Sequence, residues 1–401
     1  MKKVSNIQNG FYYIYDTKFY ITLALAKISS RKKCVSNSFE SSRILQDRKV
    51  KMKRYGNLYE KICHYDNLLL AHMEARKGKS HYLEVKEVNK NTEEYLKNLE
   101  FHLKNETYYV NSSDYRREII IDKGKEREIM KLSYYPHRIV QWAIMNVIED
   151  IMLKNLIIDT YASVRGRGIH LAAKRLRMAL SDEENTQYCL KLDIRKFYPS
   201  IDNRVLLEKL KKKFKDPKLI RLLEIIIFSV GEKGQPIGSL WSQFAGNFYL
   251  SSLDHWLKED KKIKNYFRYC DDIVILHHDK AYLHNLRKEI DKYVTDNLNL
   301  EIKGNWQVFP TNIRGIDFLG YRFFRDYTLL RKRTLKNMKI RIKKINKKKI
   351  LNYSDSCSLN SYCGWLKFCN GYRLKTKYLF PLQDSVYIDE HGERKKIRGL
   401  K

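Results

Sequence analysis

Two adjacent carboxylates, Asp271 and Asp272, stand where the chain is expected to turn sharply. They separate an aromatic-flanked run at 267–270 from a β-branched run at 273–276, and this pattern predicts a tight β-hairpin with both acids at its turn. Adjacent carboxylates repel each other, and a divalent cation compensates both charges most simply. For the dipeptide alone, an ordinary Asp-Asp turn is the alternative.

A third carboxylate, Asp193, ends an apolar run at 188–192 that predicts a buried strand. A turn and a helix that begins near Ser200 or Asp202 follow it. One carboxylate at a strand end, beside a hairpin that carries two more, can hold two Mg²⁺ ions roughly 3.5–4 Å apart. This arrangement catalyses in-line phosphoryl transfer, in which one ion activates the attacking hydroxyl and the other holds the triphosphate.

These segments resemble the motifs of reverse transcriptases. Asp193 matches the aspartate motif of that family, and Tyr269–Asp272 matches its YxDD box. The resemblance implies that Asp193 and Asp271 bind both metal ions and that Asp272 is the third carboxylate of this catalytic metal site, in a supporting place. Tyr198 matches the bulky residue that excludes a ribose 2′-hydroxyl, and a core aromatic is the alternative for this side chain.

The fold that the resemblance implies is an α+β right-hand polymerase with fingers, a palm built on an antiparallel sheet, and a helical thumb. The similarity covers about 52–380, with the polymerase motifs in the expected order. We therefore expect fingers and palm over 52–321, a basic helical thumb over 322–380 and a basic C-terminal tail over 381–401. We expect residues 1–51 to be an N-terminal extension, in which residues 29–51 are rich in Ser, Lys and Arg, a composition typical of a linker or a mobile surface segment.

Three basic residues are candidates for contacts with the incoming nucleotide. The segment 117–130 predicts two strands around a glycine-containing turn, and the resemblance assigns Lys125 and Arg127 of this hairpin to a clamp on the triphosphate. A solvated charged hairpin is the alternative. Lys303 follows a predicted strand, and the resemblance implies that it protonates or steadies the leaving pyrophosphate; an ordinary surface lysine is the alternative.

One motif departs from the usual form of the family. Most reverse transcriptases have roughly Gln-Gly-x-x-x-Ser-Pro where this chain has Ile237-Gly238-x-x-x-Ser242-Gln243. The form found here resembles the enzymes of diversity-generating retroelements, in which this box lines the nucleotide pocket and accompanies low fidelity, especially opposite template adenines. The resemblance thus places Ile237 and Gln243 at the nucleotide. Losing one polar contact of about 1 kcal/mol changes discrimination only several-fold, so Ile237 contributes to infidelity without explaining all of it.

Further positions are candidates for template and primer contacts. Arg165 and Arg167 stand between glycines before a predicted helix, where guanidinium and backbone NH groups can bind phosphate, so a template-backbone or fingers-stabilising role is expected. The segment Phe318-Leu319-Gly320-Tyr321 resembles the primer grip, a turn that holds the primer end.

A strongly basic helix is expected next. Residues 322–350 contain thirteen Lys or Arg and one acid, Asp326, with apolar residues at helical spacing. This pattern predicts a thumb helix whose cationic side, including Lys332 and Arg333, binds nucleic acid phosphates.

The composition agrees with a nucleic-acid partner. The formal net charge of +33 over 401 residues attracts polyanions, with nucleic acid the first expectation and an anionic membrane surface the second. No targeting segment or membrane span is recognised, and the odd count of seven cysteines without a CxxC pair favours a reducing cytoplasm.

Three hypotheses follow. The first is an error-prone RNA-directed DNA polymerase of the diversity-generating type in a bacterial or phage-infected cytoplasm. It would need a structured RNA template, a DNA or RNA primer, deoxynucleotides, Mg²⁺ and an accessory RNA-binding protein. The second is an anti-phage defence reverse transcriptase that makes cDNA from an associated non-coding RNA. The third is a non-catalytic RNA-binding scaffold, against which the presence of all three aspartates and Tyr198 counts.

Overall fold

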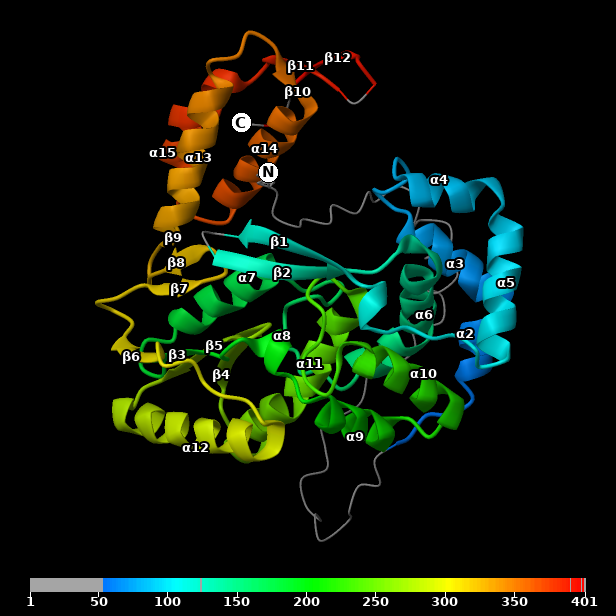
Figure 1. The fold of residues 1–401 in the computed structure, drawn as a ribbon. Coiled ribbons are helices and arrows are strands. Elements are labelled where there is room, and N and C mark those ends of the chain that lie inside the picture. The colour runs from blue at the N-terminus through cyan, green and yellow to red at the C-terminus, as the bar shows by residue number, and fades with distance from the viewer. Residues whose placement is uncertain (1–52, 123–124, 390, 398, 400–401) are drawn as a thin grey trace, which may run out of the picture.

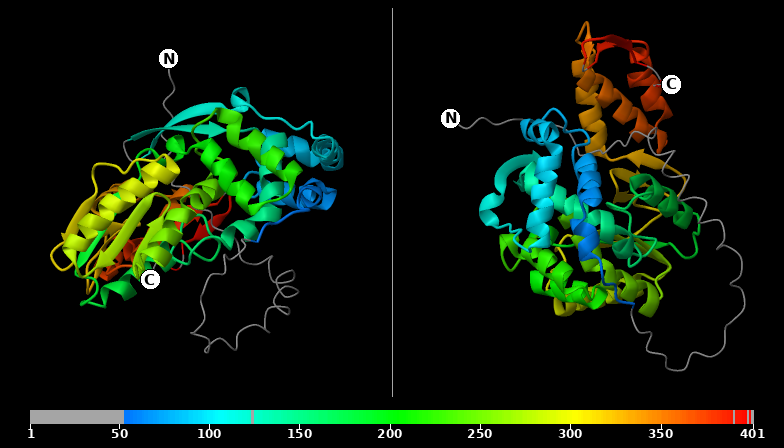
Figure 2. Two further views of the ribbon diagram at one scale, coloured as in Figure 1. Left: turned by 90° about the horizontal axis from the view of Figure 1, so that it is seen from below. Right: turned by 90° about the vertical axis from the view of Figure 1, so that its right-hand side faces the viewer.

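The structure of the protein is a computed structural model that describes residues 53–122, 125–389, 391–397 and 399. The predicted extension at 1–51 lies outside these residues. Figure 1 shows three parts: a helical group, the fingers; a central sheet with its helices, the palm; and a helical thumb. The thumb rises from one end of the palm, as the turned view in Figure 2 also shows.

The fingers are helices packed around α6, an almost continuous apolar helix at Ile139–Leu153 whose side chains are mostly buried. The surrounding helices are α2 (Tyr59–Cys63), α3 (Tyr65–Ala75), α4 (Leu83–Lys90) and α5 (Thr92–Lys104). An antiparallel hairpin of β1 (Arg116–Asp122) and β2 (Lys125–Lys131) extends from them across the palm.

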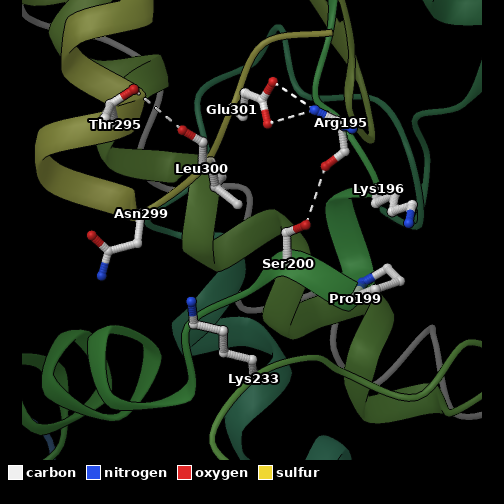
Figure 3. A pocket seen from close by; sticks show the side chains of 9 residues that line it. All are labelled: Arg195, Lys196, Pro199, Ser200, Lys233, Thr295, Asn299, Leu300 and Glu301. Atoms are coloured by element: carbon white, nitrogen blue, oxygen red, sulfur yellow. Dashed lines mark hydrogen bonds and ion pairs between the residues drawn. The ribbon is translucent and has the colours of Figure 1, made fainter.

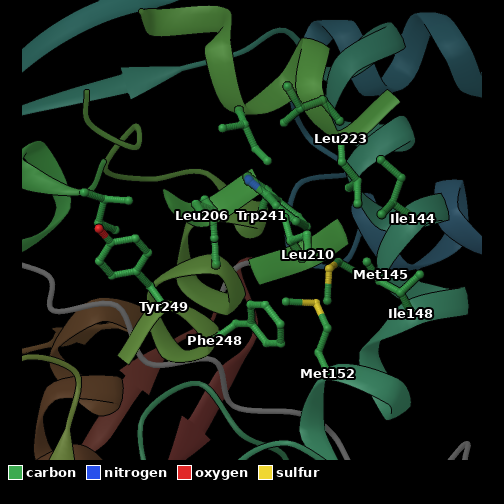
Figure 4. Close-up of a cluster of buried hydrophobic side chains, with 14 of the residues drawn as sticks. Ile144, Met145, Ile148, Met152, Leu206, Leu210, Leu223, Trp241, Phe248 and Tyr249 are labelled. Carbon is green, nitrogen blue, oxygen red and sulfur yellow. The ribbon is translucent and has the colours of Figure 1, made fainter. Parts of the chain in front are cut away.

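The palm contains a four-stranded antiparallel sheet in the order β4-β5-β3-β6. The strands are β3 (Tyr188–Asp193), β4 (Asn265–Tyr269), β5 (Asp272–His277) and β6 (Gln307–Pro310). The palm helices are α7 (Ile169–Leu180), α8 (Phe197–Ser200), α9 (Asn203–Lys213), α10 (Pro217–Ile227), α11 (Leu240–His255) and α12 (Lys280–Leu298). Side chains of α6, α9, α10 and α11 meet around Trp241 (Figure 4).

The sheet separates two hydrophobic cores because successive side chains of a strand point to opposite faces. Leu190 and Ile273 belong to the core shared with the fingers and with α9–α12. Cys189 and Val274, their neighbours in the chain, belong to a second core that contains side chains of α7 and the thumb. The strands are therefore buried on both faces, which explains why they lack an exposed polar side.

The thumb begins after a small sheet of β7 (Ile316–Phe318), β8 (Tyr321–Phe323) and β9 (Thr328–Leu330). Its helices are α13 (Lys332–Ile345), α14 (Tyr353–Lys367) and α15 (Tyr372–Tyr378). Strands β10 (Leu351–Asn352), β11 (Val386–Ile388) and β12 (Arg394–Lys396) form a sheet at its far end. Part of the predicted basic tail thus pairs with the thumb.

Local sequence signals explain where several helices begin. Asp202, Asp216 and Asp279 accept backbone N–H bonds at the starts of α9, α10 and α12. Asn352 and Asp355 form a capping box at the start of α14.

The arrangement confirms the expected α+β right hand with fingers, an antiparallel palm and a helical thumb. In the part of the chain that the structure describes, no helix is both long enough and apolar enough to cross a membrane.

Candidate active site

The strand register brings the three sequence-predicted carboxylates together at the same end of two adjacent palm strands, β3 and β5. β3 pairs with β5 so that Asp193 stands opposite Asp272. β4 and β5 form the predicted hairpin, with Tyr269 opposite Asp272. The prediction that both acids stand at its turn is wrong, because the turn consists of Cys270 and Asp271, and Asp272 is the first residue of β5. Cys270 has a φ of 55°, a left-handed conformation that non-glycine residues rarely adopt outside tight turns.

Asp193 and Asp271 form a crowded carboxylate pair. Burial and the adjacent charge of Asp193 raise the pKa of Asp271 to about 7. Two anionic oxygen donors in such a place match the preference of a hard divalent cation such as Mg²⁺. The chemistry of this donor pair therefore fits a metal site. Among the described residues, however, no group of three or more His, Cys, Asp or Glu side chains is arranged to hold a metal ion.

The third carboxylate, Asp272, faces a lysine. Lys191 Nζ lies 2.7 Å from Asp272 Oδ1, and both side chains are half-buried. Burial raises the pKa of Asp272, and the charge of Lys191 opposes this rise. The two carboxylates of the hairpin thus have different surroundings: Asp271 faces another acid, whereas Asp272 is part of an ion pair.

Tyr198 stands beside the turn of the β4–β5 hairpin. The residue lies in α8, is half-buried, and its hydroxyl is 4.0 Å from the Cys270 sulfur. Burial raises its pKa well above the usual range, so the ring is a neutral, rigid group next to the carboxylates. The role of this ring at a nucleotide sugar stays a prediction.

Lys303 also reaches the site. Its backbone N–H donates to the Asp193 carbonyl at 2.8 Å, and its ammonium nitrogen is 3.6 Å from Asp193 Oδ2. A cavity of about 510 Å³ lies next to this segment (Figure 3). Arg195 and Glu301 form a two-pronged ion pair on one wall of the cavity, and Lys233 lines the opposite wall. The basic side chains of Arg195 and Lys233 thus line a cavity next to the carboxylates.

The predicted nucleotide clamp is joined to the Ile-Gly-x-x-x-Ser-Gln box. Met130 of β2 donates its backbone N–H to the carbonyl of Ile237 at 3.1 Å. Gly238 approaches this strand closely, because a Cβ there would lie 3.0 Å from a methyl of Ile129. Arg127 has an exposed side chain on the same strand. Lys125 also belongs to β2, but its side chain lies outside the described part of the structure.

Gln243 and Arg167 both form hydrogen bonds with the loop at 157–163, and Arg165 lies in the segment that follows this loop. The Gln243 amide oxygen accepts a hydrogen bond from the Ser163 hydroxyl at 3.1 Å. Arg167 donates to the carbonyls of Ile157 and Thr160, at 2.5 and 3.1 Å, so its guanidinium stabilises the loop itself. Arg165 is more exposed and lies 3.5 Å from Glu149. Of the two roles expected for this pair, the contacts of Arg167 match the stabilising one.

The predicted primer grip is the two-residue turn between β7 and β8. Leu319 and Gly320 both have positive φ, 55° and 83°, as a type I′ hairpin turn requires. Phe318 and Tyr321 flank this turn and are fully buried. Nearby, two exposed cations, Lys332 and Arg333, occupy the first turn of α13.

A buried ion pair behind the β4–β5 hairpin was not predicted from the sequence. Arg268 and Asp254 are both fully buried, with Arg268 donating to both carboxylate oxygens at 2.7 and 2.6 Å. Arg268 also donates to the Cys270 carbonyl at 3.0 Å and so supports the turn. A charged residue inside the apolar strand at 266–269 was the available signal, but its partner is in α11, outside any local pattern.

Comparison by sequence finds a family model and a relative that are both described as reverse transcriptases. The family model described as "Reverse transcriptase (RNA-dependent DNA polymerase)" matches residues 118–323. The retron Ec73 reverse transcriptase of Escherichia coli is 26% identical over 267 residues, which cover 61% of this chain and 81% of the relative.

Two telomerase structures are more distant matches. Telomerase from Candida albicans, solved with a fragment of telomeric RNA, has a TM-score of 0.41 at 12% identity, over 55% of this chain and 46% of the telomerase. Apo telomerase from Candida tropicalis has a TM-score of 0.39 at 12% identity, over 54% of this chain and 47% of the telomerase. The matched part is thus less than half of each telomerase chain.

Proposed function

Because this chain belongs to the reverse transcriptase family of RNA-dependent DNA polymerases, we propose that it copies a structured RNA into cDNA with two Mg²⁺ ions held by Asp193 and Asp271. The observation that carries the proposal is the crowded carboxylate pair at the end of β3 and the turn of the β4–β5 hairpin. When bound, such ions promote attack by the primer 3′-hydroxyl and compensate the charge of the triphosphate.

The residues around the pair have complementary tasks in this proposal. Tyr198 stands under the sugar and excludes a 2′-hydroxyl, while Lys303 supplies a proton or a charge to the leaving pyrophosphate. Arg127 and Lys125 on the fingers hairpin hold the triphosphate from the other side. The primer end rests on the turn at Leu319 and Gly320, and the cationic first turn of α13 contacts the phosphates of the duplex.

We propose error-prone synthesis for sequence diversification as the first biological role. It is supported by Ile237 in place of the usual glutamine, beside the strand that carries the nucleotide clamp. A defence role, with cDNA made from an associated non-coding RNA, is the second candidate, and the similarity to a retron reverse transcriptase favours it. Both roles place the protein in a bacterial or phage-infected cytoplasm, with an accessory RNA-binding protein as a proposed partner.

The test is to purify the protein with its co-expressed RNA, add Mg²⁺ and deoxynucleotides, and sequence the cDNA. Errors centred on template adenines would support diversification, whereas faithful or repetitive cDNA would support defence. The variant with both Asp271→Asn and Asp272→Asn should make no cDNA yet still bind RNA. If this variant retains synthesis, the metal assignment is wrong. If the wild type makes no product even with the accessory protein, the scaffold hypothesis replaces the polymerase.

A further inference from the structure

Lys191 occupies a position between the catalytic hairpin and the primer-grip turn. It lies in β3 two residues before Asp193, on the same face of the strand, and its cross-strand partner in β5 is Val274. Asp272 is two residues from Val274, so Lys191 and Asp272 are diagonal neighbours on that face. This register explains how the ammonium nitrogen comes within 2.7 Å of Asp272 Oδ1.

The same ammonium group faces the primer-grip hairpin. Lys191 Nζ is 5.9 Å from the ring centroid of Phe318, within the range of a cation–π contact. Phe318 is fully buried and is the residue immediately before the Leu319-Gly320 turn. One lysine therefore contacts both the catalytic hairpin and the element on which the primer end is proposed to rest.

Residues of the thumb also contact the primer-grip turn. A Cβ on Gly320 would lie 2.7 Å from the Trp365 ring of α14, so only glycine fits there. Arg331, the residue before α13, donates its backbone N–H to the Gly320 carbonyl at 3.0 Å and forms an ion pair with Asp317 of β7. The primer-grip hairpin thus has contacts with both Lys191 and the thumb.

We propose that Lys191 is a positioning residue that holds the primer-grip turn in register with the catalytic strands, and that Asp272 is its counter-ion and not a metal ligand. This inference rests on the proposed function, which needs the primer 3′-end beside Asp193 and Asp271. It divides the three acids into two groups with separate tasks. Asp193 and Asp271 serve the metal ions, whereas Asp272 anchors the lysine that contacts the primer grip.

The ion-pair geometry supports this division. A lysine ammonium 2.7 Å from one oxygen competes directly with a metal ion for the lone pairs of that carboxylate. By comparison, the Lys303 ammonium nitrogen is 3.6 Å from Asp193 Oδ2. Because both members of the Lys191–Asp272 pair are half-buried, removing either one leaves the other with an uncompensated charge. Each single substitution should therefore disturb the same structure.

The experiment uses the full chain and three variants, Lys191→Met, Asp272→Asn and the double variant. The affinity for a fluorescent primer–template duplex is measured in EDTA, so that this readout needs neither metal nor catalysis. Each single variant should weaken duplex affinity by about tenfold, and the double variant by no more than either single one, because the two changes break one interaction. The Mg²⁺ concentration for half-maximal synthesis should stay within about twofold of wild type in the partly active variants.

Two further variants act as controls. Lys209→Met removes a palm lysine whose ammonium contacts the Ser252 hydroxyl, and it should leave duplex affinity unchanged. Lys191→Arg keeps the charge and should retain duplex affinity within about twofold, which also covers the case in which Lys191→Met does not fold. If Asp272→Asn raises the Mg²⁺ requirement at least tenfold while Lys191→Met binds duplex normally, Asp272 is a metal ligand and the inference is wrong. A wild type that binds duplex in EDTA but never makes cDNA would contradict the proposed function instead.

Discussion

At the residue scale, the proximity of Asp193 and Asp271 suits the proposed metal binding but should destabilise the metal-free protein. Burial and the charge of Asp193 raise the pKa of Asp271 to about 7, from the ordinary value of 3.8. A group whose pKa is higher in the folded state stabilises the fold while it is protonated, and this contribution is lost as the pH rises through the folded-state pKa. The metal-free protein should therefore lose stability because of this group as the pH rises from the ordinary pKa of 3.8 to the folded-state pKa of about 7, and this loss should level off at higher pH.

Asp271→Asn should consequently be more stable than wild type at pH 8 in EDTA. The expected gain is on the order of 2 kcal/mol in the free energy of unfolding, and it should shrink toward pH 5, where wild-type Asp271 is protonated. Chemical denaturation at both pH values measures the difference. Asp272→Asn provides the contrast, because it leaves the half-buried Lys191 without its partner and should destabilise the protein at pH 8. Equal or lower stability of Asp271→Asn at pH 8 would contradict the prediction.

At the element scale, helix α11 lacks a side chain where Tyr198 approaches it. A Cβ on Gly246 would lie 3.1 Å from both the Phe197 and Tyr198 rings, which is closer than such contacts usually are. Gly364 in α14 is also inside a helix, but a Cβ there would have no atom within 4 Å. Alanine substitutions at the two glycines can therefore distinguish a change in helix propensity from a displacement of the Tyr198 ring.

Gly364→Ala should stabilise the protein by about 0.5–1 kcal/mol, because alanine is the better helix former, and should leave nucleotide kinetics unchanged. Gly246→Ala should push the Tyr198 ring away from α11, toward the proposed sugar site. We expect KM for deoxynucleotides to rise roughly fivefold, an order-of-magnitude figure for a lost contact of about 1 kcal/mol. Single-nucleotide incorporation kinetics with deoxy- and ribonucleotides measures the effect. The ring-positioning role would be excluded if both variants had the same KM values.

The elements also show which features were predictable. The hairpin at 267–276 was predictable because its strands are adjacent in the chain, although the turn is shifted by one residue, to Cys270 and Asp271. The α+β right hand was predictable from the resemblance to reverse transcriptases. The Lys191–Asp272 pair was not, because it depends on the register between β3 and β5, whose paired residues Asp193 and Asp272 are 79 positions apart in the chain. The contacts of Arg167 were not predictable either, because the sequence does not show whether a guanidinium group binds a phosphate or a backbone carbonyl.

At the scale of the whole molecule, the thumb and the palm share a hydrophobic core. Met338 and Ile342 of α13 belong to the same cluster as Val274 and Leu276 of the palm sheet and Phe318 of the primer grip. The sequence suggested a boundary after residue 321, but the composition change there marks a basic surface and gives no information on the buried side of α13. The shared core implies that thumb and palm unfold together.

Two substitutions in α13 test this cooperativity. Met338→Ala, at a fully buried position, should lower the free energy of unfolding by about 2–5 kcal/mol. Ile340→Ala, at a position 48% exposed on the same helix, should change it by about 1 kcal/mol or less. Calorimetry should show the transition that contains the palm shifting to lower temperature in Met338→Ala, and amide hydrogen exchange in the buried palm strands β3 and β5 should become faster as well. If the heat-capacity trace instead shows a separate thumb transition that alone moves, while hydrogen exchange in β3 and β5 is unchanged, then the thumb is an independent folding unit and the shared core contributes little to stability.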